Sequence, residues 1–181
     1  MKYDYIIVGA GSAGCVIANR LSEDPSTQVL LIEAGGSDRR FFIQMPIGYG
    51  VTYHQKAVNW MYMTEPSPDA DNKPSYWPRG KVMGGSSSIN AMVYVRGNSR
   101  DFDQWSEAGN PGWSYSDVLP YFKKMESWQN GPDDYRGGDG PLNVSEVSRQ
   151  LHPLCQNFLS AAQEIGIGLN KDMNGATQEG V

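Results

Sequence analysis

The sequence has little cysteine and little histidine, and it lacks the spacings that these residues need for metal or redox chemistry. Cys15 and Cys155 are its only cysteines, and no Cys-x-x-Cys pair occurs among its 181 residues. This pattern excludes zinc fingers, thioredoxin-like redox motifs and a disulfide framework. The two histidines, His54 and His152, stand in no arrangement typical of a metal site or a catalytic triad.

The sequence also lacks a long apolar run and an excess of positive charge. The longest apolar run near the N-terminus covers residues 5–10, which is too short for a signal peptide or a membrane span. There are 15 Lys and Arg against 20 Asp and Glu, a formal net charge of −5, so we expect no nucleic-acid partner. We expect a cytoplasmic protein and leave open a peripheral association with the inner membrane.

Glycine is abundant, and the N-terminal glycines stand where a strand would meet a helix. The β-branched apolar run at residues 3–8 predicts a buried parallel strand. Apolar residues at helical spacing then predict a helix over 12–22. Residues 28–32 predict a second strand, which ends immediately before Glu33. The first 33 residues are therefore predicted to contain one complete βαβ unit.

The region that follows is broken up by prolines and shows poor periodicity. We expect residues 35–77 to be extended, with one short strand near 59–63. Further on, helices are predicted over 101–108 and 114–125, and a third from Pro153 to a glycine cap at Gly166.

The helix expected over 114–125 has a clear start and an ambiguous middle. Ser114 is a candidate N-cap with Asp117 three positions later. Pro120 lies inside the helical pattern and could kink or split the helix.

The first glycine motif, Gly9-x-Gly11-x-x-Gly14, carries a specific chemical expectation. Gly9 permits a tight turn, Gly11 lets the backbone approach a pyrophosphate, and Gly14 lets the helix pack on the strand. The phosphates would lie at the positive helix N-terminus. Glu33, 19 residues after Gly14, could accept hydrogen bonds from ribose hydroxyls and would repel a 2′-phosphate. The motif thus predicts NAD or FAD rather than NADP.

A second glycine- and serine-rich motif runs over residues 79–97. Gly84, Gly85 and Ser86 can offer backbone N–H groups and a hydroxyl to phosphate oxygens. Asn90 supplies both a donor and an acceptor, which suits the edge of a flavin. The alternatives are a solvated turn for residues 86–88 and a local backbone cap for Asn90.

These two motifs closely resemble signatures of the glucose–methanol–choline (GMC) oxidoreductases, and the resemblance extends over nearly the whole chain. The similarity is greatest to the bacterial choline dehydrogenase and aliphatic alcohol dehydrogenase branch. It implies an α/β fold, namely a Rossmann-like FAD-binding domain with a parallel sheet, incomplete in this chain. Residues 1–36 and 79–181 would form the N-terminal part of this domain and residues 37–78 a lid or loop excursion. Most of the substrate domain would lie beyond Val181.

The resemblance implies FAD as the cofactor and a set of residues that bind it. In similar proteins the stretch matching Asn90 to Val93 lines the isoalloxazine ring, and the residue matching Val82 approaches the cofactor. Some members tether FAD through a histidine that aligns with Ile89, so we expect non-covalent FAD here. The candidate cofactor-binding residues are Gly9, Gly11, Ser12, Ala13, Gly14, Glu33, Ala34, Trp60, Arg79, Val82, Gly84, Gly85, Ser86, Asn90, Ala91, Met92 and Val93.

The implied activity is oxidation of an alcohol CH–OH group, with hydride transfer to flavin N5. The implied partners are a small-molecule alcohol, an electron acceptor such as oxygen or a quinone, and the remainder of the polypeptide, which could be a separate chain. The family's histidine base is expected beyond Val181, so this chain has no predicted catalytic residue, and no metal site is predicted. Without the remaining parallel strands, the strands of this chain should be poorly buried.

Three other interpretations stay open. The same fold could serve a lyase or decarboxylase, because a fold does not fix a function. The chain could be an inactive FAD-binding fragment. An NAD-dependent dehydrogenase would share only the first motif and leave residues 79–97 unexplained.

Overall fold

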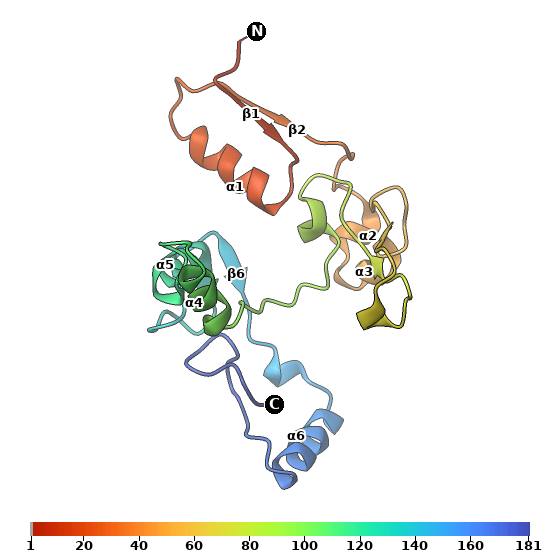
Figure 1. The fold of residues 1–181 in the computed structure, drawn as a ribbon, viewed down its shortest axis with the longest axis vertical. Coiled ribbons are helices and arrows are strands. Elements are labelled where there is room, and N and C mark those ends of the chain that lie inside the picture. The colour runs from red at the N-terminus through yellow and green to blue at the C-terminus, as the bar shows by residue number, and fades with distance from the viewer. Residues whose placement is uncertain (1) are drawn as a thin grey trace. The chain divides into compact units, whose positions relative to one another are not determined.

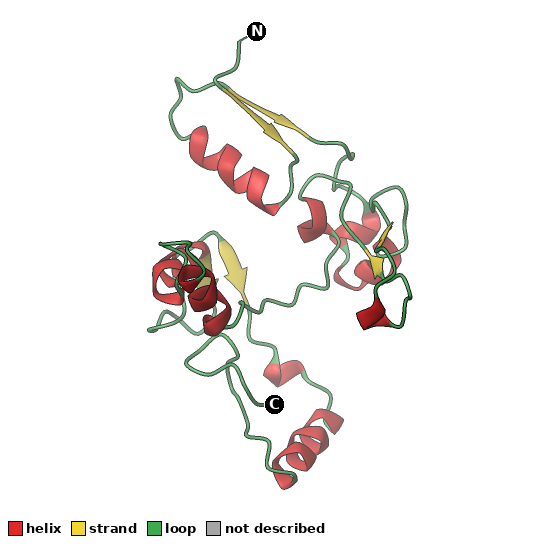
Figure 2. Cartoon of the chain, in the orientation of Figure 1, coloured by secondary structure: helices red, strands yellow, loops and turns green. Residues whose placement is uncertain are grey.

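A computed structural model describes residues 2–181, apart from the side chain of Arg149. The chain forms two compact units, which divide between Val93 and Tyr94 (Figures 1 and 2). All of the predicted cofactor-binding residues lie in the first unit. The division of the chain into 1–36, 37–78 and 79–181 stays a prediction.

The first unit consists of short strands, helices and 3₁₀ turns (η). Its elements are β1 (Tyr5–Val8), α1 (Ser12–Leu21), β2 (Val29–Ile32), α2 (Phe41–Gln44), η1 (Pro46–Gly48), α3 (Tyr49–Thr52), β3 (Tyr62–Met63), η2 (Pro68–Ala70), β4 (Tyr76–Trp77) and η3 (Gly85–Ser88).

The βαβ unit predicted at the N-terminus is confirmed. Strands β1 and β2 pair in parallel, from Tyr5 opposite Val29 to Val8 opposite Ile32. Helix α1 connects them and packs on one face of the pair (Figure 1). Parallel pairing requires such a crossover, because a tight turn reverses the direction of the chain and can join only antiparallel strands.

The β1 and β2 strands are not buried in this chain. Ile6 is 62% exposed and Val8 is 83% exposed. The prediction of a buried strand is thus wrong for these 181 residues, whereas the expectation of poor burial is confirmed. The physical reason is that a parallel strand becomes buried only when strands flank it and helices cover both faces.

The small core of the first unit includes two residues of the second glycine motif. Val58, Val82 and Ile89 are buried against one another, and Ile43 of α2 packs on them. The expectation of one short strand in residues 35–77 is incomplete, because α2, α3 and an antiparallel β3–β4 pair also form there. Each helix has only four residues, too few for a hydrophobic period to be visible.

The second unit contains the longer helices. Its elements are α4 (Ser99–Glu107), α5 (Tyr115–Met125), β5 (Glu126–Trp128), β6 (Leu142–Val144), η4 (Ser148–Gln150) and α6 (Leu154–Glu164). The three predicted helices are confirmed with small shifts at their ends. Ser114 and Asp117 form a capping box at the start of α5, and this helix continues through Pro120 without a break.

Two further features of the second unit complete the fold. Strands β5 and β6 pair in parallel, with Glu126 opposite Leu142. Gly166 follows α6 with a φ of +87°, as a C-terminal glycine cap requires. Within residues 2–181 no helix is long and apolar enough to cross a membrane.

Candidate functional site

Glycines shape the loop between β1 and α1 at the positions that the first motif predicts. Gly9 adopts a left-handed backbone with a φ of +96°, which residues with side chains rarely adopt. Its N–H donates to the Ile32 carbonyl oxygen at 2.7 Å, so the ends of β1 and β2 stay together. A Cβ atom at Gly14 would lie 1.9 Å from the Gly9 carbonyl oxygen. Only glycine therefore lets α1 begin so close to the strand.

The N-terminus of α1 is suited to an anion. Its N-cap is Gly11, which has no side chain to accept a hydrogen bond from the first turn. The first turn carries no acidic side chain. The first helical hydrogen bond runs from the Cys15 N–H to the Gly11 carbonyl oxygen at 2.9 Å. The N–H groups of Ser12, Ala13 and Gly14 precede it, and a helix provides no acceptor for them. These donors and the helix dipole together attract phosphate oxygens.

The second glycine motif packs directly against the first. The Gly84 N–H donates to the Ala10 carbonyl oxygen at 2.7 Å. Gly85 has a φ of +58°, and a Cβ atom on it would lie 2.8 Å from the Gly11 Cα. The two motifs are far apart in sequence, yet their backbones touch where a pyrophosphate is expected. Glycine at position 85 is what allows this approach.

Serine hydroxyls fix η3 at this contact. The Oγ atoms of Ser12 and Ser87 are hydrogen-bonded at 2.5 Å, which joins α1 to η3. Ser86 Oγ accepts the Gly80 N–H at 3.1 Å, and Ser88 Oγ donates to the Met83 carbonyl oxygen at 2.7 Å. The hydroxyl hydrogen of Ser86 can still be donated to a phosphate, because its oxygen acts here as the acceptor.

Glu33 joins the carboxyl ends of the two strands. Its Oε2 accepts the Ala10 N–H and its Oε1 accepts the Gly35 N–H, both at 2.8 Å. Ala34 next to it is exposed. Each carboxylate oxygen has a second lone pair, so Glu33 can hold the loop and accept a ribose hydroxyl at the same time. The structural role was not anticipated from the sequence.

Val82 and Ile89 lie in the core rather than on the surface of the site. Val82 is completely buried and Ile89 is 5% exposed. Val82 was predicted to approach the cofactor; its side chain packs inward, which leaves its backbone to make any such contact. At position 89, where the resemblance implies a tethering histidine in some members of the family, this chain holds an inward-facing aliphatic side chain, which cannot form a covalent bond to flavin.

The segment from Asn90 to Val93 is exposed. Asn90 Oδ1 accepts the Met92 N–H at 2.8 Å, so the local cap considered for Asn90 is present. Met92 has a φ of +60°, a left-handed conformation that is uncommon for a side-chain-bearing residue. Strained backbone of this kind is frequent at ligand sites. Ala91, Met92 and Val93 all present their side chains to solvent.

Trp60 and Arg79 belong to an exposed row of aromatic and cationic side chains beside the β3–β4 pair. The Trp60 ring stacks on Tyr62 with centroids 5.8 Å apart, and Lys81 Nζ lies 4.4 Å from the Trp60 centroid. The Arg79 guanidinium lies 4.9 Å from the Trp77 ring. The structure brings these two residues together, because the Trp60 N–H donates to the Arg79 carbonyl oxygen at 2.8 Å.

The second unit contains a network of four charged groups, three of them buried, that sequence reasoning missed. Glu126 Oε2 lies 2.6 Å from Arg96 Nη2, and Glu126 Oε1 lies 2.6 Å from Arg136 Nη2. Arg136 also reaches Asp172 Oδ1 at 2.8 Å. Two guanidiniums and two carboxylates balance in charge, as buried ions must. Arg96 stands in the second motif, but neither spacing nor periodicity indicated its partners.

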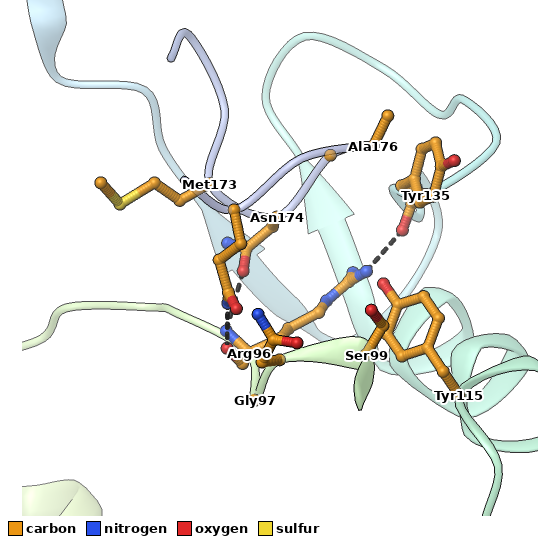
Figure 3. Close-up of a pocket in the computed structure, with 11 residues that line it drawn as sticks. Arg96, Gly97, Ser99, Tyr115, Tyr135, Met173, Asn174 and Ala176 are labelled. Atoms are coloured by element: carbon orange, nitrogen blue, oxygen red, sulfur yellow. Dashed lines mark hydrogen bonds between the residues drawn. The ribbon is translucent and has the colours of Figure 1, made fainter. Parts of the chain in front are cut away.

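A small pocket of about 80 Å³ lies beside Arg96. Figure 3 shows the Arg96 side chain extending toward Tyr135, whose carbonyl oxygen accepts from its Nη1. Asn174 holds the backbone of the same residue, because its Oδ1 accepts the Arg96 N–H at 2.8 Å. The hydroxyl-bearing residues Ser99 and Tyr115 also line the pocket. This volume suits a few water molecules rather than a dinucleotide.

The two histidines play local roles. His54 stacks on Tyr76 with centroids 5.6 Å apart, and His152 Nδ1 accepts the Leu154 N–H at 3.2 Å. Among the interactions found for residues 2–181, His54 contacts neither glycine motif. Over the same residues, no group of three or more His, Cys, Asp or Glu is arranged to hold a metal ion.

The geometry first defines a class. A parallel βαβ unit with a glycine loop, an open helix N-terminus and a carboxylate after β2 is the arrangement of dinucleotide-binding α/β domains. The family follows from comparison with known proteins: the model of the GMC oxidoreductases matches residues 3–181. The chain belongs to the GMC oxidoreductase family, as the two glycine motifs predicted.

Individual relatives agree with this assignment. The chain is 52% identical over 179 residues to the oxygen-dependent choline dehydrogenase of Vibrio vulnificus, covering 98% of this chain and 32% of that protein. It is 50% identical to the mitochondrial choline dehydrogenase of Mus musculus, covering 99% of this chain and 31% of the relative. The crystal structure of pyridoxine 4-oxidase from Mesorbium loti superposes with a TM-score of 0.90 at 35% identity, covering 99% of this chain and 35% of that one. The chain thus spans about a third of the length of these relatives.

Proposed function

We propose that this chain forms the FAD-binding third of an oxidoreductase that acts on the CH–OH group of a small alcohol. The observation that carries the proposal is the contact between Gly11 and Gly85 at the open N-terminus of α1. Two glycine motifs that touch there form a cradle lined by backbone, whose N–H groups suit the oxygens of a pyrophosphate.

The hydrogen-bonding groups of these residues suit FAD, and so do their positions. The N–H groups that begin α1, with the Ser86 hydroxyl, would hold the phosphates, and Glu33 would hold the adenosine ribose. The exposed stretch from Asn90 to Val93 would lie along the flavin. When bound, FAD supplies the redox chemistry by accepting a hydride at flavin N5 from the alcohol carbon. The buried Ile89 supports a non-covalent complex.

The substrate is proposed from the relatives. Two of them are named choline dehydrogenases, and a third is named for the oxidation of pyridoxine. All three names refer to molecules with a primary alcohol next to, or attached to, a cationic or aromatic centre. Choline is therefore the first alcohol to test, with oxygen or a quinone as the acceptor. The base that takes the hydroxyl proton would come from the remaining two thirds of the polypeptide.

The test compares the 181-residue chain with the full-length polypeptide that carries it. We expect the full-length protein to retain one FAD through gel filtration, to release it on denaturation, and to lose its flavin absorbance when choline or another alcohol is added without oxygen. A full-length protein that stays colourless in excess FAD would refute the proposal. A bound flavin that no alcohol bleaches would favour a lyase or decarboxylase instead.

One observation favours a narrower role for the chain by itself. Its two histidines, His54 and His152, make local contacts with Tyr76 and Leu154, and the resemblance places the family's histidine base outside this chain. We propose that the isolated chain is inactive. The measurement is turnover of choline by the isolated chain in excess FAD, which we expect to equal the background rate.

A further inference from the structure

The side chain of Asn59 is buried and uses its complete hydrogen-bonding capacity. It is 1% exposed. Its Oδ1 accepts two N–H groups, from Met61 at 2.9 Å and from Arg79 at 3.0 Å. Its Nδ2 donates to the Tyr53 carbonyl oxygen at 2.9 Å and to the Tyr76 hydroxyl at 3.1 Å. A side-chain amide has two donors and two principal acceptor sites, so each one is satisfied here.

The two ends of this amide hold different parts of the chain. The nitrogen holds Tyr53 and Tyr76, which both belong to the excursion over residues 37–78, and the Tyr76 hydroxyl also donates to the Tyr53 carbonyl oxygen at 2.6 Å. The oxygen holds Arg79, the first residue of the second glycine motif. It also stabilises Met61, whose φ of +55° is left-handed.

From Arg79 a continuous series of backbone contacts leads to the cradle. The Trp60 N–H donates to the Arg79 carbonyl oxygen at 2.8 Å. A Cβ atom at the next residue, Gly80, would lie 2.1 Å from the Gly85 carbonyl oxygen. Gly85 in turn lies against the Gly11 Cα. Displacement of Arg79 would therefore move Gly85 relative to Gly11, since no side chain lies between these backbones to absorb the shift.

We propose that Asn59 is a positioning residue for the cofactor site, which sets the distance between the two glycine motifs through Arg79 and Gly80. This inference rests on the proposed function, because the cradle is assigned to FAD there. Asn59 is buried and touches no phosphate-binding group itself, so its effect on FAD is exerted through the backbone of Arg79. Within this role the amide oxygen is the essential atom, and the nitrogen secures only the excursion.

The experiment uses three substitutions in the full-length polypeptide, and FAD as the probe. Asn59→Leu keeps a side chain that branches at Cγ and removes all four hydrogen bonds. Asn59→Asp keeps acceptors for Arg79 and Met61, and the Tyr76 hydroxyl can turn to donate to it. Tyr76→Phe is the matched control, because it removes a partner of the nitrogen and leaves the hydrogen bond to Arg79 intact.

We expect Asn59→Leu to raise the Kd for FAD by roughly 10- to 100-fold, the equivalent of one or two unmade hydrogen bonds. Asn59→Asp and Tyr76→Phe should change the Kd by less than about threefold, because both variants keep an acceptor for the Arg79 N–H. At saturating FAD, the visible circular dichroism of the bound flavin should change in Asn59→Leu alone. A loss of general stability would not produce this difference between the variants.

Each contrary result has a defined meaning. Wild-type Kd and circular dichroism in a folded Asn59→Leu would overturn the positioning role, as would equal effects of Asn59→Leu and Tyr76→Phe. If Asn59→Leu fails to fold, Gly80→Ala tests the same contact from the other side and should weaken FAD binding; an unchanged Kd there would also overturn the role. If the wild-type protein binds no FAD, the proposed function itself has failed.

Discussion

At the scale of single residues, Gly14 has little freedom to change. Its missing Cβ would lie 1.9 Å from the Gly9 carbonyl oxygen. We expect Gly14→Ala to destabilise the βαβ unit by about 3 kcal/mol, the upper range for overpacking, and to abolish FAD retention. Thermal unfolding and flavin content of the full-length protein measure both effects. Gly50→Ala is the control, because nothing lies within 4 Å of its would-be Cβ, and it should stabilise α3 slightly. Equal unfolding temperatures for the two variants would contradict this account.

Residues also differ in how well their roles could be predicted from the sequence. The roles of Gly9 and Gly14 follow from spacing alone, since the motif encodes a local turn. The contacts of Asn59 involve residues on both sides of it, up to 20 positions away. No periodicity encodes such a set. Glu33 was predicted as a ribose ligand, and its hydrogen bonds to Ala10 and Gly35 became visible only in three dimensions.

At the scale of elements, the junction of α5 and β5 depends on one carboxylate. Glu126 is fully buried and is the only partner of Arg96 among the ion pairs found for residues 2–181. We expect Glu126→Gln to destabilise the second unit by about 3–5 kcal/mol, because it leaves the buried Arg96 without a carboxylate partner and Arg136 with Asp172 alone. Urea unfolding monitored by tryptophan fluorescence provides the measurement. Glu107→Gln, on the exposed side of α4, should change the free energy of unfolding by less than about 0.5 kcal/mol. Similar midpoints for both variants would show that the network is not needed for stability.

Elements with their own start and stop signals were predicted well. The helix α5 has its capping box, and α6 has proline before it and Gly166 after it. The helices α2 and α3 were missed, because four residues make about one turn and carry no visible stripe. The parallel pairing of β5 with β6 was missed as well. Each has three residues, and tertiary contacts rather than propensity determine such short strands.

At the scale of the whole molecule, the chain exposes apolar surface that a stable monomer would cover. On α6, Leu154 is 66% exposed and Phe158 is 67% exposed, and Ile165 just beyond it is 77% exposed. We expect the isolated chain to bind a hydrophobic dye strongly and to self-associate, because large exposed apolar patches promote association. The full-length polypeptide should do neither. Dye fluorescence and sedimentation of both preparations provide the test, and a monomeric isolated chain without dye binding would contradict it.

The separation of the two glycine motifs along the chain has a consequence for the order of folding. The Ala10–Glu33 hydrogen bond closes a span of 23 residues, whereas the Ser12–Ser87 hydrogen bond closes one of 75. Loop-closure entropy makes the longer span costlier by only about 1 kcal/mol, but contacts distant in sequence form more slowly. During synthesis the βαβ unit can therefore form long before residue 87 leaves the ribosome. The part of the cradle on α1 therefore forms first, and the part on η3 forms only after residue 87 has been synthesised.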